Sequence, residues 1–197
     1  MNRESTPIRE KIILAAINCI ERDGIHGVTN RGIAREAGVN SAAVNYYFGS
    51  KENLLDIALK ATLREGFVNP LEELGLRQKD FSSAMEDILS FLADGTVKFP
   101  GITKAHLYDP LMNGKYDVEF VKEVRQFMEY LFDLAKSHHP EWNDEDIRLS
   151  LAEVWSSIVL MGVLPEFYRQ VLHLDIQDPQ VRKRFVKHLA SRHFPGR

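Results

Sequence analysis

The chain has 197 residues, of which 27% are charged and 44% hydrophobic, and its formal net charge is −3 at pH 7. These values are typical of a globular protein with one domain, or with a small domain fused to a larger one, and they exclude a basic nucleic-acid coat protein. The single cysteine, Cys19, excludes an intramolecular disulfide, so a reducing compartment is expected.

Charge is distributed unevenly along the chain. Residues 1–51 carry seven Lys or Arg against five acidic residues, whereas the remainder has a net charge of −5. The first ten residues contain no apolar signal core, and the longest uninterrupted apolar run, Ile158–Leu164, is far shorter than the roughly 20 residues that cross a bilayer. We therefore expect a cytoplasmic protein without membrane contact, whose N-terminal part faces an anionic partner.

The apolar residues recur with helical periodicity, and no alternating segments flanked by hairpin turns are present, which predicts an all-α protein. The first three helices are expected at about 7–23, 30–37 and 41–47. Thr6 and Thr29 have the residue type of N-caps, and Gly38 supplies a left-handed turn between the second and third helices. Two short helices joined by such a turn indicate a helix-turn-helix unit.

A longer fourth helix is expected from about Lys51 to Gly66, before Asn69-Pro70, and it joins this unit to the rest of the chain. The division predicted from the sequence is a DNA-binding domain over 1–51 and a larger helical domain over 52–197. Helices in the larger domain are expected at about 80–97, 103–108, 117–137, 143–164 and 178–194, which gives about nine helices in all, with a further short turn of helix at 166–172.

The third helix has the residues that a helix needs to read the major groove of duplex DNA. Such a helix presents small or polar side chains outward and apolar ones, here Val44 and Phe48, inward. Asn45 is notable because asparagine can pair bidentately with adenine. The residues expected to face bases are Ser41, Ala42, Asn45 and Tyr46, with packing against the protein as the alternative for Tyr46.

A second group is expected to hold the DNA backbone. These residues start the second helix, end the third or start the fourth, where helix N-termini also favour phosphate. The predicted phosphate contacts are Thr29, Asn30, Arg31, Tyr47 and Lys51.

Three short motifs lie in and directly after the predicted helix-turn-helix unit. They are Ile33-Ala34 in the second helix, Ala37-Gly38-Val39 at the turn, and Tyr46-Tyr47-Phe48 followed by Ser50-Lys51-Glu52-Asn53-Leu54-Leu55. In this order the segment from about residue 8 to residue 58 resembles the TetR family of transcriptional regulators. Many family members have tyrosine where Asn45 stands, and Ala42-Ala43 also departs from the pattern, so the resemblance implies no particular operator sequence.

The resemblance implies an all-helical homodimer that binds a palindromic operator, with the last two long helices, about 143–164 and 178–194, forming a four-helix bundle with their mates. It also implies a small-molecule effector bound in the larger domain, and most family members are repressors that the ligand releases from DNA. Candidate pocket residues, for which ordinary core packing is the alternative, are Phe91, His106, Tyr108, Met112, Phe127, Met128, Tyr130 and Trp155.

Other classes of function lack support in the sequence. No nucleophile elbow, phosphate-binding glycine loop or two-histidine zinc helix is present, so we expect no enzyme and no cofactor. The pairs His138-His139 and His188 with His193 lack further ligands, so no metal site is expected. The remaining alternative is an architectural or adaptor protein that binds DNA without a ligand.

Overall fold

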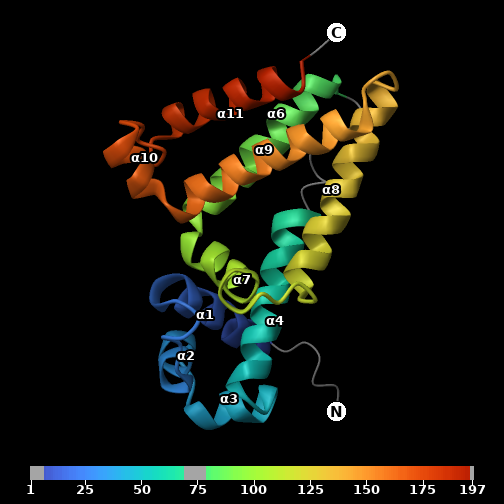
Figure 1. Cartoon of the computed structure of the whole chain (residues 1–197). Coiled ribbons are helices and arrows are strands. Elements are labelled where there is room, and N and C mark those ends of the chain that lie inside the picture. The colour runs from blue at the N-terminus through green and yellow to red at the C-terminus, as the bar shows by residue number, and fades with distance from the viewer. Residues whose placement is uncertain (1–6, 69–78, 196–197) are drawn as a thin grey trace. The chain divides into compact units, whose positions relative to one another are not determined.

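The computed structural model describes residues 7–68 and 79–195. Within these residues the chain forms ten α-helices and one π-helical turn, and no strand, so the predicted all-α class is confirmed (Figure 1). The predicted cap Thr6 and the predicted helix end at Asn69-Pro70 lie outside the described residues.

The chain forms two compact units, which do not follow the predicted division at residue 51. Unit 1 contains the described residues up to Arg64 together with Gly101–Phe120, and unit 2 contains those of Glu65–Pro100 and from Val121 onward. The units differ from the predicted 1–51 and 52–197 because later helices share the core of the first ones. Buried Ile102 and Ala105, for example, pack in one cluster with the N-terminal helices.

Unit 1 contains five helices around a single apolar core. They are α1 (Pro7–Asp23), α2 (Asn30–Ala37), α3 (Ser41–Phe48), α4 (Lys51–Leu63) and α7 (Pro100–Asn113). Helix α1 contacts both α2 and α4, and its apolar face buries Ile12, Ala16 and Ile20 completely. This core holds the two short helices in place, because helices of eight residues are marginal without tertiary packing.

Helix α7 is longer than the predicted 103–108. It begins at Pro100, where the missing amide hydrogen is not needed, and it continues through Pro110 to Asn113. Its N-terminal end lies directly against α1. A Cβ atom at Gly101 would stand 2.3 Å from the carbonyl oxygen of Glu21, and the Glu21 carboxylate accepts the Ile102 amide at 2.9 Å.

Unit 2 holds the remaining helices. They are the π-helical turn η1 (Arg64–Val68), whose first residue belongs to unit 1, then α6 (Phe81–Lys98), α8 (Glu119–His138), whose first two residues belong to unit 1, α9 (Asp144–Val163), α10 (Pro165–Val171) and α11 (Pro179–His193). Helix α6 contacts both α9 and α11, and these two helices also contact each other. Gly162 of α9 permits the approach to α6, since a Cβ there would meet Thr96 at 2.4 Å.

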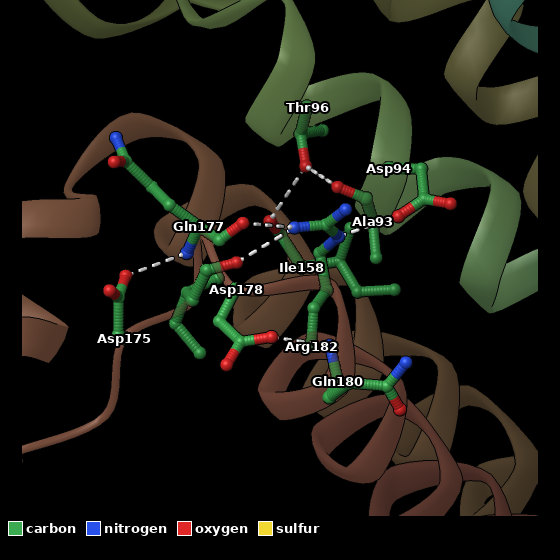
Figure 2. A network of polar contacts seen from close by, with 10 residues as sticks. Ala93, Asp94, Thr96, Ile158, Asp175, Gln177, Asp178, Gln180 and Arg182 are labelled. Carbon is green, nitrogen blue, oxygen red and sulfur yellow. Dashed lines mark hydrogen bonds and ion pairs between the residues drawn. The ribbon is translucent and has the colours of Figure 1, made fainter.

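A polar network fastens the start of α11 to α6 (Figure 2). The Arg182 guanidinium forms an ion pair with Asp94 and donates to the carbonyls of Ile176 and Gln177 at 2.8 and 3.3 Å. Asp178 caps α11 by accepting the Gln180 amide at 2.7 Å. The Arg182 side chain is only 13% exposed, so these partners compensate the desolvation of its charge.

No single described helix is long and apolar enough to span a membrane. Helices α9 and α10 reach the required length and composition only together, as a pair bent by 91°.

The contact between α7 and α1 yields a stability prediction. Gly101→Ala forces a methyl group against the α1 backbone, and we expect it to lower the free energy of unfolding by roughly 1–3 kcal/mol. Gly95→Ala in α6 is the matched control, because nothing lies within 4 Å of the added atom and a helical alanine stabilises by about 0.5–1 kcal/mol. Urea unfolding measures both, and equal effects of the two substitutions would contradict the close approach.

Candidate nucleic-acid interface

A left-handed turn joins α2 to α3. The Thr29 hydroxyl caps α2 by accepting the Gly32 amide at 3.0 Å. At the other end Gly38 has φ 64°, and its amide donates to the carbonyls of Ala34 and Arg35. Glycine adopts this conformation without the steric cost that a Cβ brings, so the chain reverses within a few residues. The predicted helix-turn-helix geometry follows from these caps.

Both ends of α3 are fixed by side chains. The Asn40 side chain accepts the Ala43 amide at 2.8 Å at the start of α3. After its end, Ser50 caps α4 by accepting the Asn53 amide at 3.1 Å, and the Asn53 side chain donates back to the Phe48 carbonyl at 2.9 Å. Helix α3 is therefore attached to α4 by hydrogen bonds as well as by its core residues.

The two faces of α3 have opposite character. Val44 and Phe48 are buried in the core of unit 1. The four predicted base-reading residues are all exposed, namely Ser41, Ala42, Asn45 and Tyr46. Tyr46 makes an edge contact with the Tyr47 ring, at 5.2 Å between centroids, yet remains 55% exposed. This side of α3 meets the requirement for a groove-reading helix, which is small and polar groups outside and apolar anchors behind.

The predicted phosphate-binding residues differ in how they are placed. Arg31 is exposed on α2, and Tyr47 is half-buried against the unit 1 core. The Thr29 hydroxyl oxygen already serves as the α2 cap. Lys51 donates from Nζ to the carbonyl of Val28 at 3.2 Å, which ties the first turn of α4 to the loop before α2.

Two hydrogen bonds of this region could not be predicted from the sequence. One is the Lys51 bond to a backbone carbonyl 23 residues away, and the other joins the side chains of Asn30 and Asn45, which are 15 residues apart. Neither follows from periodicity or cap spacing. The bonds of Ser50 and Asn53, in contrast, follow the usual position of a serine three residues before the capped amide.

Arg22 of α1 forms two ion pairs on the surface, one with its neighbour in α1 and one that links α1 to α2. Arg22 contacts Asp23 at 2.9 Å and Glu36 at 3.0 Å, and the Arg22 hydrogen bond lowers the pKa of Asp23. These groups are well exposed, so each pair contributes little to stability. Their consequence is electrostatic, because the Arg22 charge offsets part of the negative charge of Asp23 and Glu36.

The eight candidate pocket residues are divided between the two units. His106, Tyr108 and Met112 lie on α7 in unit 1, whereas the other five lie in unit 2, on α6, α8 and α9. Met112 is 69% exposed, and Tyr108 packs on His26 with ring centroids 4.3 Å apart. Among the described residues, no group of three or more His, Cys, Asp or Glu side chains could hold a metal ion.

Within unit 2 an aromatic cluster brings together two of the candidates. The Phe67 ring of η1 lies 5.4 Å from that of Phe127 and 6.3 Å from that of Trp155, measured between centroids. Phe67 was not among the residues predicted from sequence, because η1 follows the end of a regular helix and carries no periodic signal. We call Phe67, Phe127 and Trp155 the aromatic cluster.

His106 makes a polar link between α7 and α4. The Thr62 hydroxyl donates to the Leu59 carbonyl at 2.7 Å, so its oxygen is left to accept the Nε2–H of His106 at 2.9 Å. The ring also stacks on Phe120, with centroids 5.4 Å apart. Burial lowers the pKa of His106 to about 4, so the ring is neutral at pH 7 and its interaction with Thr62 is that of an uncharged donor.

Comparison with known proteins identifies the segment that contains this interface. Residues 12–58 match the family model of bacterial regulatory proteins of the tetR family, which confirms the predicted resemblance. The transcriptional regulator BetI of Vibrio vulnificus is 39% identical over 57 residues, which are 29% of each chain. The match thus spans under a third of that relative's length.

Solved structures resemble the whole chain in fold. The fatty acid degradation regulator FadR of Bacillus halodurans has a TM-score of 0.72 at 16% identity, covering 98% of this chain and 100% of that one. FadR of Bacillus subtilis, solved in complex with stearoyl-CoA, has a TM-score of 0.60 at 17% identity, covering 92% and 96%. These likenesses show that the body, like the N-terminal segment, has the fold of these regulators.

The position of Lys51 yields a binding prediction. We expect Lys51→Ala to weaken binding to all duplex sequences by the same factor, because a phosphate contact carries no base information. It should also reduce the slope of log affinity against log salt by about 0.9, the value for one phosphate. Lys60→Ala removes an equal charge further along α4, where Lys60 pairs with Asp56, and should leave the slope unchanged. Fluorescence anisotropy over a salt series measures both, and an unaltered slope for Lys51→Ala contradicts the phosphate role.

Proposed function

We propose that this chain, whose residues 12–58 carry the tetR-family DNA-binding domain, is a ligand-responsive transcriptional repressor that binds a palindromic operator as a homodimer and leaves it when a small molecule binds. The observation that carries the proposal is the exposed row of Ser41, Ala42 and Asn45 on α3, backed by buried Val44 and Phe48. An α-helix fits the major groove, and side chains of this size allow close approach to base edges.

A homodimer is supported by an apolar stripe on the exposed side of α9. Leu149 is 56% exposed and Leu160 is 44% exposed, and the small residues Ala152 and Ser156 lie between them on the same face. Residues spaced in this way line one side of a helix and are suited to pack against a second helix. This face of two leucines and two small residues is suited to close helix packing, and we assign it to a second copy of the chain because homo-oligomers with two-fold symmetry are the commonest assemblies.

The charges of the last two long helices are complementary. The exposed face of α11 carries Lys183, Arg184, Lys187 and Arg192, and the helix has no acidic residue. The first turn of α9 carries Asp144, Glu145 and Asp146. If α9 of one protomer lies beside α11 of the other in a two-fold symmetric dimer, the acidic turn of α9 faces the basic residues of α11. The symmetry repeats this favourable electrostatic contact, so it occurs twice in the interface.

An apolar or partly apolar effector is supported by the aromatic cluster of unit 2. Its three rings come from η1, α8 and α9, three elements that a bound ligand could shift relative to one another. FadR of Bacillus subtilis has a related fold and binds stearoyl-CoA, which favours a ligand with an apolar part. We assign the effector to unit 2 for these reasons.

The chain connectivity offers a route from ligand to DNA. The chain passes between the two units at Arg64–Glu65, Pro100–Gly101 and Phe120–Val121. The first crossing lies where α4 runs into the π-helical turn, and the second lies at the start of α7. A displacement in unit 2 is therefore transmitted to α4 and α7, both of which pack in the core behind the reading helix.

The operator and the ligand are tested together. We expect a protected palindromic footprint on genomic DNA upstream of the regulated gene, with half-sites one helical turn or a multiple of it apart. A thermal-shift screen should then yield a small molecule that stabilises the protein and weakens operator binding. Footprints without sequence preference would contradict the regulator, and a sequence-specific footprint that no stabilising ligand alters would favour an adaptor that acts without an effector.

The dimer is tested at Leu149. We expect Leu149→Asp to raise the dimer dissociation constant roughly 100-fold, because the symmetric interface loses one buried leucine from each protomer. Leu111→Asp is the control, since Leu111 is 70% exposed on α7, outside the stripe, and should retain the dimer. Light scattering over a dilution series measures the mass of each. A monomeric wild type, or equal masses for wild type and Leu149→Asp at every concentration, would contradict this interface.

A further inference from the structure

A side-chain hydrogen bond crosses the helix-turn-helix unit from its first helix to its reading helix. Nδ2 of Asn30, the first residue of α2, donates to Oδ1 of Asn45 in α3 at 3.3 Å. Asn45 is exposed on the face proposed to read bases, whereas Asn30 is half-buried behind it. The role that this contact gives to Asn30 rests on the proposed function, since it concerns how Asn45 meets DNA.

The surroundings of Asn30 fix which end of its amide faces Asn45. Oδ1 of Asn30 is fully buried and accepts no hydrogen bond from the described residues. If the Asn30 amide were rotated by half a turn, its NH2 group would occupy the buried position of Oδ1. Two N–H donors would then be buried without a partner instead of one carbonyl oxygen. Buried donors without partners are rarer than buried carbonyl oxygens without partners. The orientation with Nδ2 toward Asn45 is therefore the favoured one.

The orientation of Asn30 in turn sets that of Asn45. Because Oδ1 of Asn45 is turned toward the Asn30 donor, its Nδ2 group points away from that contact with both hydrogens available. In the major groove such a donor finds acceptors on guanine, adenine and thymine. Cytosine offers only an amino donor there.

We propose that Asn30 is a positioning residue that makes Asn45 a hydrogen-bond donor to the base edge, so that cytosine is rejected at the position that Asn45 reads. This replaces the prediction of Asn30 as a phosphate contact. Asn30 acts through Asn45, and its loss changes base preference as well as affinity.

The first test is a double-mutant cycle on the operator with each of the four base pairs at every position. Wild-type protein should bind operators with an acceptor base at one position roughly 5- to 150-fold more tightly than the cytosine form, the range for one good base contact. Asn45→Ala should abolish this ratio. Asn30→Ala should reduce the ratio at the same position, and the double variant should resemble Asn45→Ala.

The second test reverses the hydrogen bond with an isosteric side chain. In Asn30→Asp the carboxylate only accepts, so it attracts Nδ2 of Asn45 and turns Oδ1 toward the DNA. The preference should shift toward a base that exposes an amino group, cytosine or adenine. The added negative charge lowers the affinity for every operator by the same factor. This factor cancels in the ratio of affinities for operators that differ at one base. A wild-type preference in Asn30→Asp would overturn the proposal.

Arg31→Ala is the matched control, because Arg31 is the exposed neighbour on α2 and should lower affinity equally for all bases. If Asn30→Ala behaves in the same way and its effect adds to that of Asn45→Ala, Asn30 is a phosphate contact and the proposal fails.

Partial unfolding of a variant does not alter the ratio of affinities, since all operators compete for the same folded protein. A wild type without any operator preference overturns the proposed function together with this inference, whereas an intact preference that is insensitive to Asn30 overturns only the inference.

Discussion

The close approach of α7 to the end of α1 is the constraint on which unit 1 depends. Gly101 places its backbone against the Glu21 carbonyl, and the Glu21 carboxylate holds the Ile102 amide at 2.9 Å. With this end fixed, Ile102 and Ala105 complete the core that also buries Val44 and Phe48 of α3. A segment near the middle of the sequence is therefore part of the unit that contains the tetR-family match, and the packing of α3 depends on residues outside that match.

The border between the units falls inside helical backbone at all three crossings, in η1, α7 and α8. Helix α4 ends at Leu63 and the π-helical turn follows at once, with the border between Arg64 and Glu65. π-helical turns interrupt the regular hydrogen-bond ladder and often occur at functional sites.

Much of unit 1 could be predicted from sequence because its helix ends are marked by local chemistry. Thr29, Gly38 and Ser50 lie at the predicted ends, and the exposed residues of α3 are the predicted ones. The length and place of α7 could not be predicted, since Pro110 suggests a break and only the packing of α7 on α1 favours continuing. The contact of Asn30 with Asn45 could not be predicted either, because a side-chain pair between helices leaves no periodic trace.

The interleaved course of the chain has a consequence for engineering and for evolution. A fragment that stops at residue 64 would keep every residue of the tetR-family match but would lack α7, and the apolar surface that Ile102 and Ala105 cover would face water. A chimera that joins unit 1 of this chain to unit 2 of another regulator would have to keep residues 101–120 with unit 1. Otherwise Glu21 and its neighbours would have to be redesigned to pack against a different helix. Recombination at residue 64 would therefore separate α1 from the helix that packs against it.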